Sequence, residues 1–388
     1  MGLDMSQRSD LFQLLFGLRR NPFRHGAIAT PGADVPFHVD LYPGIAQQMA
    51  TAFLGATKPP PIGILWSLGT GEEARGFGKT RYLLWFADEV NRDQGRRALA
   101  LAGVNDANEQ ALALYAAFHT LNGVSLSHLL FDLVRSAVDG PRSPLASLLA
   151  ASSKDRRSLY VAATKYLIGT RQPWSAPMLH RLCYTNPDNV ALFLADPTAF
   201  RNWHMSRWGR ELFRTVVAFL RLLGVNRLVA LIDQVEDFAS WVTPVYKLRR
   251  DFARLAELCI ADPVLSGHVT FVLTMHPESA RVATRHWPSE QLGSISPSRP
   301  DRHVLVLREP PLAGIIGLVR AYLDRERVAR GGDRLRPFTH KAVCSVHSLC
   351  GGRPGRCIPL LAFLLETAAD RRICRIDEAD VYAWTAER

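Results

Sequence analysis

The sequence predicts an α/β protein with a largely parallel sheet and helices on both faces, followed by a small all-helical domain. Two observations lead to this prediction. Short apolar runs alternate with segments of helical periodicity up to about residue 309, and strand signals stop from Pro310 onward. Strands that alternate with helices favour crossover connections and therefore a parallel sheet. The expected parts are an N-terminal extension over 1–40, an α/β domain over 41–309 and a helical domain over 310–388.

The expected strands are short apolar runs, most of which end at polar or glycine-rich segments. They cover residues 62–68, 97–104, 227–232, 269–275 and 303–307. Helical spacing before residue 309 predicts helices over 11–18, 45–54, 80–90, 211–223 and 247–260, with further helical material over 107–170. The helical domain is expected to contain four helices, over 312–325, 339–349, 356–369 and 377–385.

Composition indicates a globular protein with polyanionic partners. Of the 388 residues, 47% are hydrophobic and 21% charged, so a sizeable core is available. No apolar run reaches the roughly 18 residues of a membrane span, and no export signal is evident, so we expect a cytoplasmic protein without membrane attachment. The six cysteines form no CxxC pair and are expected to be buried thiols. The net charge of +11 favours nucleic acid as a partner, although a GC-rich genome would produce part of the arginine excess.

A glycine-rich loop follows the first expected strand and precedes a helix. This order, with Lys79 and Thr80 after the glycines, is the context of a phosphate-binding loop. Glycines let backbone N–H groups approach phosphate oxygens, the lysine reaches the β- and γ-phosphates, and the threonine hydroxyl binds Mg²⁺. The candidate nucleotide-binding residues are Gly76, Phe77, Gly78, Lys79, Thr80 and Arg81. Glu73 stands where the common pattern has glycine, and an ordinary glycine turn is the alternative.

The strand over 227–232 is followed by Asp233, a suitable ligand for Mg²⁺ or its waters. A second carboxylate is needed to polarise the attacking water. Gln234 occupies the position where that acid usually follows, so Glu236 is the candidate base, while Asp237 could instead cap a helix. The sequence thus predicts an ATP–Mg²⁺ site with slow or partner-dependent hydrolysis. The chain has no Asn-Lys-x-Asp element that would favour GTP.

From about residue 40 to the end, the chain resembles the AAA+ ATPases, and in particular their replication-initiator and transposition-regulator branch. A polar residue at the tip of the strand after the acidic strand matches the sensor 1 position, which implies Thr274 or His276. The segment 350–356, with two glycines, a proline and two arginines before a helix, is similar to the sensor 2 segment of that branch. The resemblance implies a nucleotide contact from Arg356, or next from Arg353. Strand-end and surface-turn roles are the alternatives.

The resemblance further implies a homo-oligomeric ring or filament in which an arginine finger from one subunit completes the next site. Arg285 is the favoured finger, with Arg281, Arg299 and Arg302 as other candidates. The leading hypothesis is an ATP-dependent switch that assembles on DNA or on a partner protein. A signalling or defence ATPase that controls an effector protein without DNA is the alternative, and a small-molecule kinase is a third.

Overall fold

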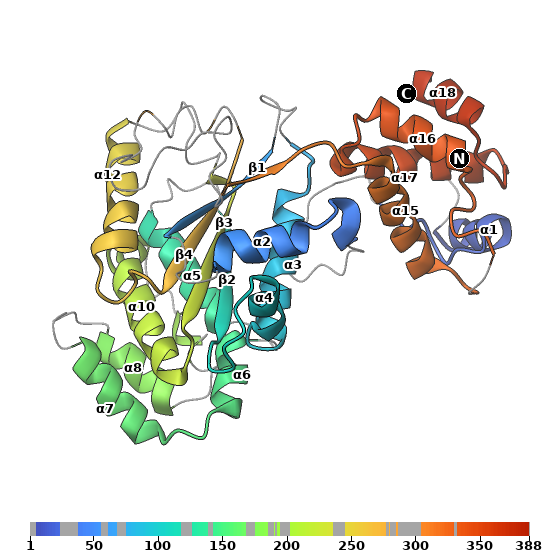
Figure 1. Cartoon of the computed structure of the whole chain (residues 1–388). Coiled ribbons are helices and arrows are strands. Elements are labelled where there is room, and N and C mark those ends of the chain that lie inside the picture. The colour runs from blue at the N-terminus through green and yellow to red at the C-terminus, as the bar shows by residue number, and fades with distance from the viewer. Residues whose placement is uncertain are drawn as a thin grey trace. The chain divides into compact units, whose positions relative to one another are not determined.

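The computed structural model describes the greater part of the chain. The described residues are 5–23, 38–55, 61–67, 75–117, 126–138, 143–167, 175–184, 190, 192–194, 202–235, 245–276, 279, 285, 304–329 and 332–387. They divide into two compact units, each made of separate segments of the chain. Figure 1 colours the chain by residue number from the N- to the C-terminus. One, here called the lid unit, comprises Met1–Ile45, Ser67–Arg81 and Leu307–Arg388; the other, the sheet unit, comprises Ala46–Trp66 and Tyr82–Val306. The three-part domain division expected from the sequence stays a prediction.

The sheet has five strands in the order β2-β3-β4-β1-β5. The strands are β1 (Ile62–Ser67), β2 (Ala111–Ala117), β3 (Arg227–Asp233), β4 (Val269–Met275) and β5 (Val304–Leu307). The pairs β1–β4, β2–β3 and β3–β4 are parallel, and every residue of β1, β3 and β4 is buried. Strands buried along their whole length belong to a sheet covered on both faces. The register places Ile232 beside Leu273, so the carboxyl ends of β3 and β4 meet at one edge.

Helices cover both faces of the sheet. On one face, Ile62, Ile64 and Trp66 join a core cluster with residues of α5 and α10. On the other face, Gly63 makes room for Phe53 of α2, because a Cβ at that position would lie 2.5 Å from the Phe53 ring. Figure 1 shows the same division, with α5, α8 and α10 on one side and α2 and α3 on the other. The helices that contribute to the sheet unit are α2 (Ile45–Leu54), α3 (Lys79–Arg92), α4 (Arg96–Leu101), α5 (Leu126–Val138), α6 (Pro144–Ala151), α7 (Arg156–Leu167), α8 (Ser175–Tyr184), α10 (Asn202–Leu223) and α12 (Val245–Ala256), the last continued by a π-helical turn (Glu257–Ala261).

One predicted strand was wrong. Residues 97–104 form most of helix α4 and the turn after it, and the second strand is β2, within a region expected to be helical. Both segments contain the same Ala-Leu alternation, and both residue types are strong helix formers, so local preference cannot separate them. Tertiary contacts decide: Asn91 pairs with the backbone of Ala113 through two 2.8 Å hydrogen bonds, while the other edge of β2 pairs with β3.

The lid unit is helical. Its helices are α1 (Met5–Phe16), α15 (Leu312–Glu326), α16 (His340–Leu349), α17 (Pro354–Asp370) and α18 (Glu378–Ala386). The last four agree closely with the predicted helices, and two of them begin at strong local signals. The Thr339 hydroxyl caps α16, and Asp377 forms a capping box with Asp380 at the start of α18.

The segment after α1 is attached to this helical bundle. Leu18 forms an antiparallel bridge with Arg327, and the ring of Phe23 stacks on Tyr322 at 5.4 Å between centroids. The N-terminal segment therefore packs with helices that follow it in the chain by about three hundred residues.

The cysteines agree with the expectation of buried thiols at four positions, Cys183, Cys259, Cys350 and Cys357. Cys344 is half-buried and Cys374 is exposed. Within the described ranges, no helix combines the length and the apolar character that a membrane crossing requires.

Candidate nucleotide site

The phosphate loop leads directly into helix α3, which begins at Lys79. Gly76 and Gly78 adopt φ angles of 84° and 89°, in the left-handed region that favours glycine. Lys79 is buried, and its Nζ donates a hydrogen bond of 2.8 Å to Ser67 Oγ at the end of β1. This bond holds the ammonium group between the strand end and the loop, the position from which a lysine reaches bound phosphates. Residues 68–74, with Glu73, lie outside the described part.

The helical lid contacts this loop directly. Gly355, in the first turn of α17, donates its N–H to the carbonyl of Gly76 at 2.9 Å. A Cβ on Gly355 would lie 2.6 Å from Gly76 Cα, so the two backbones approach as closely as only glycine permits. On another side, Tyr42 donates its hydroxyl to the carbonyl of the buried Phe77 at 2.9 Å. Two loop carbonyls therefore accept hydrogen bonds, one from a backbone N–H after residue 350 and one from a side chain near residue 42.

The two candidate sensor 2 arginines differ in their surroundings. The Arg353 guanidinium lies 5.6 Å from the centroid of the Phe77 ring, and its Nε and Nη1 atoms are buried without a hydrogen-bond partner among the described residues. Arg356 is exposed on the first turn of α17. Buried guanidinium donors beside a phosphate loop are well placed for an anionic ligand. The structure thus brings Arg353 to the loop, although Arg356 was the first choice from sequence; the nucleotide contact itself stays a prediction.

The predicted acid and the predicted sensor 1 residue are in contact within the sheet unit. Asp233 is 1% exposed, and its Oδ1 accepts hydrogen bonds from the Thr274 hydroxyl and the Gln234 N–H, both at 2.9 Å. The Gln234 N–H also lies 2.8 Å from Thr274 Oγ, and Gln234 itself has a φ of 58°. The backbone N–H of Gln234 therefore contacts both Asp233 and Thr274, as that of any residue other than proline could.

Tyr115 is a member of this network that sequence reasoning missed. Its hydroxyl donates to Asp233 Oδ2 at 3.1 Å across the β2–β3 pair. Burial and the adjacent Asp233 carboxylate raise the pKa of Tyr115, so the phenol stays protonated and remains a donor. Its segment was expected to be helical, so the sequence offered no reason to place Tyr115 beside the strand that ends at Asp233. Ser67 was also missed, although a polar residue ending an apolar strand before a glycine loop is a usable signal.

The remaining candidates have varied positions. His276 is buried, and its Nδ1 accepts the N–H of Ser279 at 3.2 Å, so that ring atom is used within its own turn. Arg285 is exposed. Thr80 and Arg81 are half-buried on the first turn of α3. The candidates that lie outside the described residues are Glu236, Asp237, Arg281, Arg299 and Arg302.

Replacing Gly355 with alanine is expected to lower both the free energy of unfolding and the affinity for ATP. The new methyl group would meet the Gly76 backbone, which has no side-chain freedom to move away. Overpacking of this kind costs about 1–3 kcal/mol of unfolding free energy, measurable by urea denaturation. We expect ATP affinity to fall as well, because the displaced turn disturbs the loop. Gly351→Ala is the control: Gly351 lies in the turn before α17 and has a φ of 57°, so alanine there adds backbone strain, but its nearest contact is a side-chain atom at 3.7 Å and ATP affinity should be unchanged. Equal ATP affinities for both variants would contradict a role for the Gly355 contact.

A five-stranded parallel sheet, a phosphate loop after β1 and a C-terminal helical domain define the P-loop AAA+ fold, and the fold class predicted from the sequence is confirmed. Among solved structures, the chain is similar to the ORC2 protein of Aeropyrum pernix in its ADPNP–ADP complexes. That match has a TM-score of 0.50 at 10% identity and covers 90% of this chain and 68% of the other. The resemblance to the replication-initiator branch is therefore confirmed at the level of the fold.

Two further structures match less well. The ADP form of the same ORC2 protein gives a TM-score of 0.49 at 10% identity, covering 96% of this chain and 73% of the other. The Aeropyrum pernix ORC1 protein in complex with DNA gives 0.41 at 16% identity, covering 91% and 65%. No protein-family model and no curated protein matches the sequence.

Proposed function

We propose that this protein binds ATP with Mg²⁺ and works as a slowly hydrolysing switch. The observation that carries the proposal is the loop Gly76–Thr80, whose lysine is held at the strand end and whose backbone bonds to the lid at Gly355. In this proposal Lys79 binds the β- and γ-phosphates, and the N–H groups at the start of α3 face the same anion. Arg353 or Arg356 adds a further charge-assisted contact.

The residues proposed for Mg²⁺ are Thr80 and Asp233. Hydroxyl and carboxylate oxygens are the hard donors that this ion prefers, and Mg²⁺ usually keeps several waters beside one or two carboxylates and the substrate phosphates. When bound, the ion would neutralise the charge that develops on the phosphates.

The chemistry proposed for the protein's own groups is hydrolysis assisted by Thr274 and Glu236. Thr274 would orient the attacking water or the γ-phosphate, and Glu236 would accept the proton from that water. Gln234 stands between Asp233 and the next acid, so we expect turnover to be slow or to depend on a partner. An arginine finger from a second subunit, with Arg285 as the favoured residue, would raise that rate.

The contact between Gly355 of α17 and Gly76 of the phosphate loop supports a switch. Gly355 donates a hydrogen bond to the loop that would hold the phosphates. A change in the loop on nucleotide binding would therefore shift the start of α17. We propose that ATP promotes a homo-oligomer, a ring or a filament, on DNA or on a partner protein in the cytoplasm. The net charge of +11 supports DNA as the polyanion.

Sedimentation velocity with and without ATP–Mg²⁺, each with and without duplex DNA, tests this function. We expect a larger species with ATP and a further increase with DNA. Assembly that needs ATP but ignores DNA would support the alternative, a signalling or defence ATPase acting on an effector protein. A monomer under all four conditions would overturn the switch.

A further inference from the structure

Residues 38–42, which precede the sheet in the chain, lie against helix α15 of the lid unit. Two glycines of that helix make the close approach possible. A Cβ on Gly314 would lie 2.4 Å from the Leu41 carbonyl oxygen, and one on Gly317 would lie 2.1 Å from His38 Nε2. A side chain at either glycine would therefore push the segment away, so its position is set by the surface of α15.

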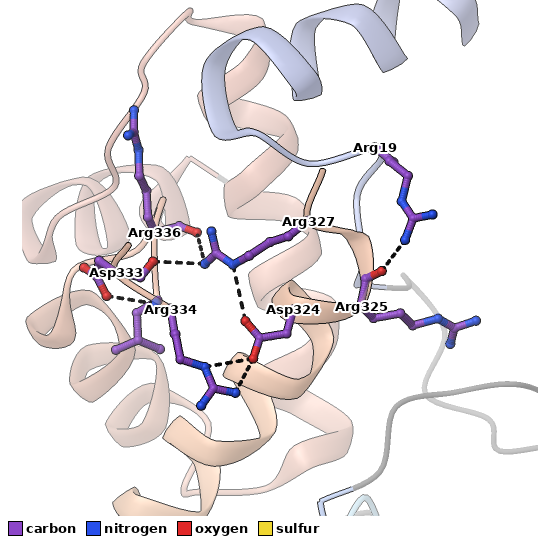
Figure 2. Close-up of polar contacts among 8 residues, drawn as sticks. Arg19, Asp324, Arg325, Arg327, Asp333, Arg334 and Arg336 are labelled. Carbon is purple, nitrogen blue, oxygen red and sulfur yellow. Dashed lines mark hydrogen bonds and ion pairs between the residues drawn. The ribbon is translucent and has the colours of Figure 1, made fainter. Parts of the chain in front are cut away.

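The end of α15 is held in turn by other parts of the lid unit. Figure 2 shows Asp324 accepting a hydrogen bond of 3.3 Å from Arg327, the residue that follows the helix. It also shows Arg19, from the segment after α1, donating to the Arg325 carbonyl. Residues 38–42 thus lie on a helix that has its own supports.

Tyr42 connects this segment to the phosphate loop. Its hydroxyl donates to the Phe77 carbonyl at 2.9 Å, and both residues are buried. The Tyr42 backbone is bonded as well, because its carbonyl accepts the N–H of Ile45 at 3.1 Å at the start of α2. In a low-dielectric interior a hydrogen bond is stronger than at the surface, so the Tyr42 hydroxyl gives the Phe77 carbonyl a defined direction.

The hydrogen bonds that the loop carbonyls accept also set the direction of two backbone N–H groups. A trans peptide is planar, so its C=O and its N–H point in opposite directions. The Phe77 carbonyl points at Tyr42, and the Gly78 N–H of the same peptide therefore points away from Tyr42. The Gly76 carbonyl points at the Gly355 N–H, so the Phe77 N–H points away from Gly355. Successive backbone N–H groups in such a turn form the concavities that bind phosphate in proteins.

We propose that Tyr42 is a positioning residue for the phosphate chain of ATP, whose hydroxyl holds the Phe77–Gly78 peptide so that the Gly78 N–H faces the phosphates. The inference rests on the proposed function, in which this loop binds ATP. Tyr42 contacts no phosphate in this role and acts through one peptide bond. It lies 35 residues before Phe77 in the chain and outside the glycine-lysine-threonine pattern of the loop.

Tyr42→Phe in the full-length protein tests the role, because it removes the hydroxyl and keeps the ring. We expect ATP affinity to fall roughly three- to tenfold, the change that corresponds to one hydrogen bond. Titration with ATP in the absence of Mg²⁺ measures this change without a contribution from the metal.

An NMR signature separates positioning from a loss of stability. Labelling phenylalanine carbonyls with ¹³C and glycine nitrogens with ¹⁵N selects Phe–Gly peptides, and the sequence contains two, Phe16–Gly17 and Phe77–Gly78. In the wild type, ATP should shift the Gly78 amide signal. In the nucleotide-free protein, Tyr42→Phe should shift that same signal. The Gly17 signal, from the end of α1, should stay in place in both comparisons and serves as the internal reference.

Tyr322→Phe is the matched control, because it removes the same hydroxyl from a buried tyrosine of α15. It should keep wild-type ATP affinity and leave the Gly78 signal in place, whatever its effect on the melting temperature. Wild-type affinity in Tyr42→Phe, a Gly78 signal that does not move, or an equal loss of affinity in Tyr322→Phe would overturn the positioning role alone. Failure of the wild type to bind ATP would overturn the proposed function and this role with it.

Discussion

Replacing Lys79 with alanine is expected to abolish measurable ATP binding. Lys79 is the buried cation of the phosphate loop, and its Nζ is held 2.8 Å from Ser67 Oγ at the strand end. Truncating one partner of a buried charged contact costs roughly 2–5 kcal/mol, so ATP affinity should fall by at least ~30-fold. Equilibrium binding of a fluorescent ATP analogue without Mg²⁺ isolates this contact from the metal.

Lys165→Ala provides the control for this experiment. Lys165 is an exposed lysine in the last turn of α7, so its removal changes the net charge equally and should leave ATP affinity unchanged. The melting temperature of both nucleotide-free variants should remain close to that of wild type. Wild-type ATP affinity in Lys79→Ala would remove the basis of the proposed function.

Asp233→Asn is expected to stop hydrolysis while leaving nucleotide binding without Mg²⁺ intact. The amide oxygen can still accept from Thr274 and from the Gln234 N–H, and the new NH₂ group can donate to Tyr115, whose hydroxyl can rotate to accept. The network therefore survives, but the negative charge that would order Mg²⁺ is lost. Phosphate release should fall by roughly 100-fold or more, by analogy with the loss of one preorganised transition-state contact.

Tyr115→Phe separates the role of the Asp233 charge from that of the hydrogen bond it accepts from Tyr115. It removes the hydrogen bond to Oδ2 but keeps the carboxylate, so phosphate release should remain within about tenfold of wild type, the cost of one hydrogen bond.

Rapid hydrolysis by Asp233→Asn would show that this carboxylate is not the metal ligand and would direct the search to other acids.

Much of the fold could be predicted because its boundaries are local. Strand β4 and helix α2 have the predicted bounds, and the lid helices α16 and α18 begin at capping residues that the sequence displays. Strand β2 could not be predicted, because the segments at 97–101 and 111–114 share one pattern and only Asn91 and β3 distinguish them. Its misassignment is also why Tyr115 was missed.

The candidate site was predictable in its parts but not in its contacts. Motif order named Lys79, Asp233 and Thr274, yet sheet order is a long-range property, so the sequence could not show that β4 lies between β3 and β1. The contacts of the Gln234 N–H were likewise hidden, since every non-proline residue carries the same backbone donor. The Gly355–Gly76 bond joins residues distant in the chain, and both glycines look like ordinary turn residues in the sequence.

The bridge between Leu18 and Arg327 has a practical consequence for dissecting the protein. A fragment cut at residue 310, where strand signals end, would lack the segment carrying Leu18 and Phe23 and would expose the face of Tyr322 on which Phe23 stacks. Such a fragment should be poorly soluble even though all four of its helices are intact. Expressing the helices with residues 5–23 attached through a linker would cover Tyr322 again. The lid is therefore better treated as a discontinuous unit, whose first part is synthesised before the sheet and whose last part is synthesised after it.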